Sequence, residues 1–250
     1  MSEGLEGRKA VVTGASSGIG EATALALAAA GASVALGARR KDRLDEIAKR
    51  IEADGGSAHA YEVDVGDEGT ARRFIEGAAE QMGGLDILVN NAGVMLLGPV
   101  EGADTDEWRR MVNVNLLGLL YCTQAAMPLI REAGGGDIVN LSSVAGRTAA
   151  MGSGVYNLTK WGVNGFSEAL RQEALHSKIR VTVVEPGFVD TELQGHNTNP
   201  VVVEAIEKMR EQTGDLLEAS DIAASILHAI SQPPRVSLNE MLIRPTGQQR

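Results

Sequence analysis

The stretch Val11-Val12-Thr13-Gly14-Ala15-Ser16-Ser17-Gly18-Ile19-Gly20 decides the fold class of this 250-residue chain. The segment Arg8–Thr13 is typical of a short buried strand, and the alanine- and leucine-rich run 21–30 predicts a helix. Glycines between a strand and a helix let the backbone approach a pyrophosphate, whose charge the helix N-terminus then binds. The stretch therefore predicts a dinucleotide site, although its Gly-x3-Gly-x-Gly spacing also fits a tight strand-to-helix turn without a ligand.

Strand-like and helix-like segments alternate along the rest of the chain. The further expected strands are 33–37, 58–63, 86–89, 137–141, 179–184 and 240–243, and the further expected helices are 42–54, 68–82, 106–131, 155–176, 200–212 and 219–230. Such alternation predicts a parallel sheet with helices on both faces. No linker or internal repeat divides the chain, so we expect one α/β domain over residues 1–250, a doubly wound sheet of the Rossmann type.

Turn-forming and polar residues gather after several predicted strands. They form the glycine turn, Asn90-Asn91-Ala92-Gly93, Ser142-Ser143 and Pro186-Gly187. A parallel sheet binds ligands at the carboxyl ends of its strands. These four loops are therefore expected to line one crevice.

Composition and charge exclude several classes of function. The net charge of −10 argues against nucleic acid or an anionic membrane as a partner. The single cysteine, Cys122, lies in an apolar run and is expected to be a buried core residue. No segment has the length of a membrane span or the pattern of a signal peptide, and the four histidines lack metal-ligand spacing. We expect a soluble, cytoplasmic protein without a metal.

Tyr156 and Lys160 lie four residues apart in the predicted helix 155–176, so their side chains share one face. A nearby ammonium favours the phenolate and lowers the tyrosine pKa from its usual value of about 10. Such a tyrosine can act as an acid or a base near neutral pH. The same spacing also occurs on ordinary exposed helix faces, so the pair gains meaning from the glycine turn.

The joint pattern resembles the short-chain dehydrogenase/reductase family from about residue 5 to 245. It comprises Thr13-Gly-x3-Gly-Ile-Gly20, Asn90-Asn-Ala-Gly93, Asn115, Ser143, Tyr156-x3-Lys160 and Pro186-Gly-x3-Thr191. The resemblance implies that Tyr156 protonates a carbonyl oxygen, to which Ser143 also hydrogen-bonds. It implies that Lys160 binds the nicotinamide ribose and lowers the Tyr156 pKa, and that Asn115 holds a water in the proton relay. Ser142 and Asn113 are the neighbouring alternatives, but the family spacing favours Ser143 and Asn115.

The resemblance also implies a set of cofactor-binding residues. These are Gly14, Ser16, Ser17, Gly18, Ile19, Gly20, Arg39, Arg40, Asp64, Val65, Asn91, Ala92, Gly93, Tyr156, Lys160, Pro186, Gly187, Val189 and Thr191. NAD enzymes carry an acidic residue after the second strand, whereas this chain has Ala38 followed by two arginines. Arginine suits a 2′-phosphate, so NADPH/NADP is expected and NADH less so. Against this, the arginines also fit solvated residues before a helix, and Ser17 stands where many NADP members carry a basic residue.

Substrate and direction are less sharply indicated. Residues 191–214 fall where the family keeps a substrate lid, and His196 on it is a candidate substrate contact. Segments 95–101, 191–196 and 243–246 resemble aldehyde reductases of the clavulanic acid dehydrogenase type and bacterial NADP-dependent 3-hydroxy-acid dehydrogenases. We expect reduction of a small or medium aldehyde or ketone. Oxidation of an alcohol or 3-hydroxy acid by the same site, or a nucleotide sensor without turnover, are the alternatives.

Two predicted helices, 106–131 and 155–176, carry more apolar surface than one sheet face can cover. A two-fold contact between copies would bury the surplus. The family resemblance likewise implies a dimer of dimers, so a homotetramer is expected. Cover by the lid and the C-terminal segment is the alternative.

Overall fold

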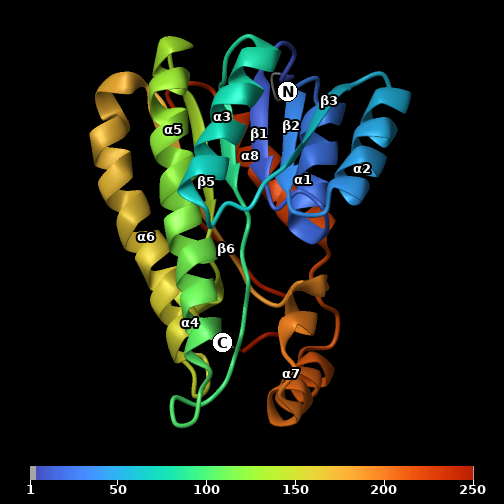
Figure 1. The fold of residues 1–250 in the computed structure, drawn as a ribbon, viewed down its shortest axis with the longest axis vertical. Coiled ribbons are helices and arrows are strands. Elements are labelled where there is room, and N and C mark those ends of the chain that lie inside the picture. The colour runs from blue at the N-terminus through green and yellow to red at the C-terminus, as the bar shows by residue number, and fades with distance from the viewer. Residues whose placement is uncertain (1–3, 250) are drawn as a thin grey trace.

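The computed structural model describes residues 4–249, which form one parallel sheet of seven strands between two layers of helices (Figure 1). The strand order is β3-β2-β1-β4-β5-β6-β7. The strands are β1 (Lys9–Thr13), β2 (Ser33–Ala38), β3 (Ser57–Glu62), β4 (Ile87–Asn90), β5 (Gly136–Leu141), β6 (Ile179–Pro186) and β7 (Glu240–Ile243). The predicted fold class is thus confirmed.

Eight α-helices and four shorter turns connect the strands within residues 4–249. The α-helices are α1 (Gly18–Ala29), α2 (Lys41–Ala53), α3 (Glu68–Met82), α4 (Thr105–Val112), α5 (Gly118–Glu132), α6 (Gly154–Ala174), α7 (Pro200–Thr213) and α8 (Ala219–Ile230). The short elements are a π turn, η1 (Asn113–Leu117), and the 3₁₀ turns η2 (Val144–Gly146), η3 (Leu175–Ser177) and η4 (Glu192–His196).

Alternate residues of the central strands face opposite helix layers. Val12 of β1 packs in the core with α1, α2 and α8, whereas Val11 packs in the core with α3, α5 and α6. Both side chains are fully buried. A strand buried on both faces needs a continuous apolar run, which explains why Val11 and Val12 stand side by side in the sequence.

The order of the strands reverses beside β1. This strand pairs with β2 on one side and with β4 on the other, through Ala10 opposite Val34 and opposite Ile87. The chain therefore leaves β1 and β4 toward opposite faces of the sheet. A crevice opens at the carboxyl ends of such a pair of strands, and ligands of doubly wound sheets bind there.

The expected single helix 106–131 is wrong in one respect. The five-residue π turn η1 separates α4 from α5. A π turn is wider than an α-helical turn, and such turns are frequent at functional sites. Here the turn carries Asn115, whose side chain is buried.

The segment after β6 extends beyond the sheet. It comprises η4 and α7, and Figure 1 shows α7 beyond the carboxyl ends of the strands. Only Ile206 and Thr213 of α7 are buried. The segment thus covers the end of the sheet at which the crevice opens, where the sequence predicts a lid.

Candidate active site

The loops at the carboxyl ends of the strands surround a cleft of about 300 Å³. All predicted catalytic and cofactor-binding residues line it except Gly20 and Asn115. The lining residues that the sequence reasoning did not place in the cofactor or catalytic set are Ala38, Val63, Val94, Val114, Leu141, Ser142, Glu192, Leu193, Gln194 and His196.

The glycines of the turn between β1 and α1 leave no space for larger side chains. Gly14 has φ of +66°, and a Cβ atom there would lie 2.8 Å from the Cα of Ala92. A Cβ on Gly20 would lie 2.3 Å from the carbonyl oxygen of Gly14. Gly20 therefore acts behind the cleft, where it allows α1 to start against the turn. Gly18 and Ile19 at the start of α1 line the cleft, where a helix N-terminus can bind a pyrophosphate.

Thr13 connects the glycine turn to the loop after β4. Its Oγ1 accepts hydrogen bonds from the backbone N–H groups of Asn91 and Ala92, each at 3.0 Å. Nδ2 of Asn91 in turn donates to the carbonyl oxygen of Thr13 at 2.9 Å. The two sides of the strand-order reversal are thus held at a fixed separation.

Asn115 anchors the continuation of that loop. Its Oδ1 accepts from the N–H of Val94 at 2.8 Å, and its Nδ2 donates to the Val94 carbonyl at 2.9 Å and to Oγ1 of Thr159 at 3.2 Å. Both N–H groups of the amide are used in this way. The water-holding role predicted for Asn115 stays a prediction.

Ser142 and Ser143 have different surroundings. Oγ of Ser142 is buried and donates to the backbone carbonyl of Lys160 at 3.1 Å. Oγ of Ser143 accepts from the N–H of Ala145 at 3.1 Å and hydrogen-bonds to the Tyr156 side chain. The structure therefore pairs Ser143, and not Ser142, with the tyrosine.

Tyr156 has a pKa opposite in direction to the one expected. Burial raises the pKa of its phenol to about 12, against a smaller lowering by the Ser143 hydrogen bond. The ring packs against Val94, Leu96 and Met111, which exclude water from it. The expected low pKa of Tyr156 is not found, because removal from water outweighs the Ser143 hydrogen bond. The Lys160 ammonium lies 5.7 Å from the ring centroid, and its stabilisation of the phenolate stays a prediction.

Lys160 is itself buried, with 6% of its surface exposed. Burial lowers the pKa of its ammonium to about 8. Nζ donates to the carbonyl oxygen of Leu141 at 2.8 Å, which is its one hydrogen bond within residues 4–249. An ammonium has three N–H donors, so two remain for a ligand in the cleft. Together with the glycine turn, this donor set fits a nicotinamide dinucleotide.

Arg40 crosses from the end of β2 to the glycine turn. Its Nη2 donates to the hydroxyl groups of Ser17 at 2.7 Å and Ser16 at 3.0 Å, and its Nη1 donates to Oε2 of Glu192 at 2.8 Å. The guanidinium of Arg40 thus brings a positive charge to the glycine turn, which has no basic side chain of its own. Arg39 lines the same cleft and is exposed, with no hydrogen bond in the described part of the chain.

Glu192 also binds Arg43 on α2, at 2.7 Å between Oε1 and Nη1. Sequence reasoning missed both residues. About 150 positions separate Glu192 from the arginines, and a lone glutamate in a lid carries no pattern that signals such a contact. Only the placement of η4 beside the start of α2 reveals it.

His196 faces the cleft from the end of η4. Its Nδ1 is buried and has no hydrogen-bond partner within the described residues. Burial lowers the pKa of the imidazole, and Arg110 and Arg39 lower it further by repulsion. A neutral histidine can accept or donate a hydrogen bond at neutral pH. His196 therefore stays a candidate substrate contact.

Three further sequence expectations concern other parts of the molecule. Cys122 is buried, and burial raises the pKa of its thiol to about 12. Within residues 4–249, no helix is long and apolar enough to cross a membrane. In the same range, no three or more histidine, cysteine, aspartate or glutamate side chains are grouped so that they could hold a metal ion.

The fold and the cleft define a Rossmann-type oxidoreductase with a tyrosine, serine and lysine at its centre. The model of the family described as "short chain dehydrogenase" matches residues 8–201. The chain belongs to this family of short-chain dehydrogenases and reductases.

Relatives of known sequence cover nearly the whole chain. A glycine betaine reductase of Emericella nidulans is 43% identical over 242 residues, which are 96% of this chain but only 19% of that protein. An uncharacterised oxidoreductase of Staphylococcus saprophyticus is 41% identical, and the match covers 95% of this chain and 96% of that protein.

Solved structures agree with the fold. An alcohol dehydrogenase of the archaeon Thermococcus sibiricus, in complex with 5-hydroxy-NADP, matches with a TM-score of 0.86 and 29% identity over 97% of this chain and 98% of that one. A 7α-hydroxysteroid dehydrogenase in complex with NADH and 7-oxo glycochenodeoxycholic acid matches with a TM-score of 0.90 and 27% identity, over 100% and 97%.

Proposed function

We propose that the protein is an NADPH-dependent reductase of small or medium aldehydes or ketones. The observation that carries this proposal is the pairing of Ser143 with a protonated, buried Tyr156 in a cleft that Lys160 also lines. Two hydroxyl groups close together can converge on one carbonyl oxygen. The bound cofactor would supply the hydride.

The residues then have separate tasks. Ser143 and Tyr156 donate hydrogen bonds to the carbonyl oxygen, which stabilises the negative charge that develops there. Tyr156 gives up its proton to that oxygen. Lys160 directs its two remaining N–H donors at the ribose hydroxyl groups and, as the proton leaves, stabilises the phenolate. Asn115 holds the water through which a proton returns to Tyr156.

Use of NADP(H) is supported by the arginines after β2. Ala38 stands where NAD enzymes carry the acidic residue that binds the 2′-hydroxyl, and Arg39 and Arg40 offer positive charge at the cleft. One structural neighbour is described as an NADP-type complex and another as an NADH complex. The proposed preference for NADPH therefore rests on the charges of this chain.

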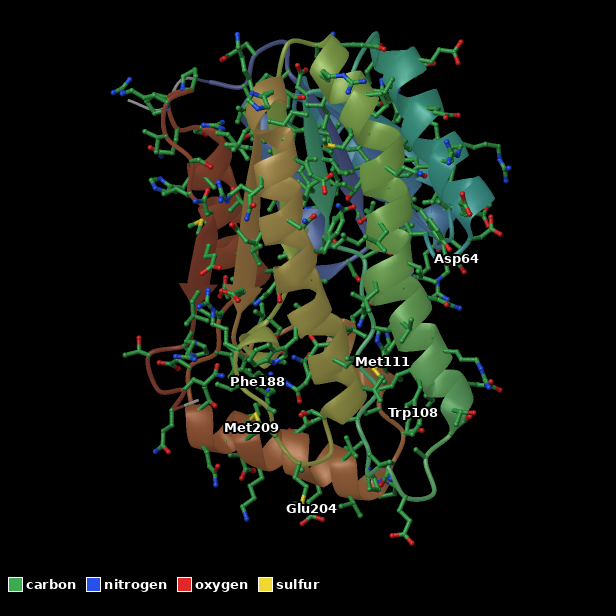
Figure 2. All side chains as sticks on the ribbon, turned by 90° about the vertical axis from the view of Figure 1, so that its left-hand side faces the viewer. Asp64, Trp108, Met111, Phe188, Glu204 and Met209 are labelled. Carbon is green, nitrogen blue, oxygen red and sulfur yellow. The ribbon has the colours of Figure 1, made fainter. Side chains whose placement is uncertain are left out.

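Several apolar side chains lie around the lid, outside the lining of the cleft. Figure 2 shows Phe188 and Met209 on the side of α7 that faces the sheet, and Trp108 and Met111 on α4. Met151 is fully exposed and lies outside the lining of the cleft.

Turnover assays test the proposal. Purified protein is incubated with NADPH or NADH and a panel of aldehydes and ketones, and loss of the reduced cofactor is followed by absorbance. We expect turnover with NADPH. NADP with alcohols or 3-hydroxy acids tests the oxidative alternative, and cofactor binding without turnover of any substrate would instead identify a nucleotide sensor.

A further inference from the structure

The contact between η4 and α2 brings a carboxylate to the arginines of the proposed 2′-phosphate site. Glu192 accepts one hydrogen bond on each oxygen, from Arg40 at 2.8 Å and from Arg43 at 2.7 Å. Arg40 is oriented for this contact by the hydroxyl groups of Ser16 and Ser17. A carboxylate that bridges two guanidinium groups satisfies the same donors that a phosphate would use.

These ion pairs are easy to exchange. The side chains of Arg40, Arg43 and Glu192 are 41%, 43% and 51% exposed, and ion pairs this exposed to water contribute little to stability. Hydrogen bonds from Arg43 and Arg40 lower the pKa of Glu192 to about 2, so it is ionised at neutral pH. A phosphate ester carries about −1.5 to −2 charges. It would therefore bind the two guanidinium groups more strongly than the carboxylate does, and would repel the carboxylate.

Glu192 also fastens the beginning of the lid. It is the first residue of η4, directly after Thr191, whose methyl group faces Gly18 of the glycine turn. At the far end of η4, Asn197 holds the loop after β4 through the N–H of Leu97 at 2.7 Å. The segment 191–197 therefore connects the cofactor side of the cleft to the substrate side.

We propose that Glu192 is an internal competitor for the cofactor 2′-phosphate. It occupies Arg40 and Arg43 until the phosphate displaces it, and its displacement releases the segment 191–196 from α2. Arg43 thereby becomes a further residue of the 2′-phosphate site. A ribose 2′-hydroxyl is neutral and cannot displace the carboxylate, so NAD(H) leaves the segment fastened. This inference rests on the proposed use of NADP(H).

Binding measurements give the first test. Calorimetry compares adenosine 2′,5′-bisphosphate with 5′-AMP, which lacks only the 2′-phosphate. We expect Glu192→Gln to tighten binding of the bisphosphate about two- to fivefold, as the loss of exposed ion pairs allows, and to leave 5′-AMP unchanged. Glu204→Gln removes the same charge from α7, where Figure 2 shows Glu204 directed away from the sheet, and is the matched control.

Amide hydrogen exchange gives the second test, since neither probe carries a nicotinamide that could hold the lid. In the wild type, the bisphosphate should speed exchange in residues 192–197, whereas 5′-AMP should not. In Glu192→Gln these residues should exchange fast without any ligand. Slower exchange in the wild type with the bisphosphate would overturn the proposal, because it would mean that Glu192 and the phosphate share the arginines.

The two proposals fail differently. Should the wild type bind both probes equally, the proposed preference for NADP(H) is wrong. Should it prefer the bisphosphate while Glu192→Gln binds both probes as the wild type does, only the competition by Glu192 is wrong.

Discussion

At the scale of single residues, burial sets the protonation states in the cleft. It keeps the Tyr156 phenol protonated and brings the Lys160 pKa down to about 8. A proton donor must hold its proton until charge develops on the substrate oxygen, so the raised tyrosine pKa suits reduction. Oxidation of an alcohol needs the phenolate form of Tyr156, so the rate of oxidation should rise with pH.

Tyr156→Phe removes the proton donor and little else. We expect kcat to fall by about 10²–10⁴-fold or more, with NADPH affinity nearly unchanged. Steady-state kinetics and a fluorescence titration with NADPH measure the two effects. A variant that keeps more than about a tenth of the wild-type kcat, well short of that loss, would refute the assignment of Tyr156 as the acid.

Lys160 should make the stability of the cofactor-free protein depend on pH. Burial lowers its pKa from 10.5 to about 8, which corresponds to roughly 3 kcal/mol. Below pH 8 both the folded and the unfolded chain carry the charge, and the folded chain bears the full cost of burying it. Between pH 8 and 10.5 the folded chain releases the proton first, so this contribution to stability rises with pH.

Lys160→Met should therefore be more stable than the wild type below pH 8, although it is inactive. The difference in the free energy of unfolding between the variant and the wild type should narrow as the pH rises from 8 toward 10. Urea unfolding at several pH values measures it, with Lys49→Met, at an exposed position of α2, as the control. A difference that stays constant over this range would contradict the lowered pKa.

Cofactor preference should depend on both arginines after β2. Arg39→Ala is expected to raise KM for NADPH several-fold, and Arg40→Ala to raise it more, because Ser16 and Ser17 hold Arg40 in place. Neither change should affect KM for NADH much. Equal KM values for the two cofactors in the wild type would remove the basis of this prediction.

At the scale of elements, a substitution in the glycine turn tests how closely β1 and α1 pack together. A methyl group on Gly20 would force the backbone of Gly14 to move, so Gly20→Ala should cost about 1–3 kcal/mol of stability and weaken cofactor binding. Gly77→Ala, in α3, meets only ordinary contact at 4.0 Å and should gain about 0.5–1 kcal/mol. Thermal unfolding compares the two variants, and a Gly20→Ala protein as stable as the wild type would show that the turn can relax.

The elements themselves follow closely from the sequence. Hydrophobic period and glycine position predict α3, α8 and β7 to the residue, because these signals are local. The π turn η1 could not be predicted, since Asn115 is drawn inward by Val94 and Thr159, which belong to other elements. Likewise, the spacing of the motifs predicts that the catalytic residues lie together. It does not predict the pKa of Tyr156, because that pKa depends on how deeply the side chain is buried.

At the scale of the whole molecule, one face of α6 has no cover within residues 4–249. Leu158 and Trp161 are 62% and 53% exposed, whereas Val163 and Leu170 on the opposite side are buried in the core. Neither the lid nor the described C-terminal segment covers the exposed pair. Leu158 and Trp161 lie one turn apart, and a second copy of α6 would cover both in a two-fold contact.

We therefore predict a homotetramer of about 105 kDa, from four chains of 26.2 kDa, or at least the dimer formed through α6. Light scattering at micromolar concentration measures the mass. The double variant Leu158→Glu/Trp161→Glu should yield a smaller species because charge cannot be buried in the contact. A single wild-type species of about 26 kDa would exclude the interface.

The π turn also has a consequence for how this chain can change. A π turn amounts to one residue inserted into a helix, and one residue corresponds to about 100° of rotation. It lets Met111 of α4 contact the cluster around Tyr156, while Cys122 and Ile130 of α5 contact the sheet. Deleting one residue from 113–117 would make α4 and α5 one regular α-helix. Either α4 or α5 would then be rotated away from the residues it now packs against.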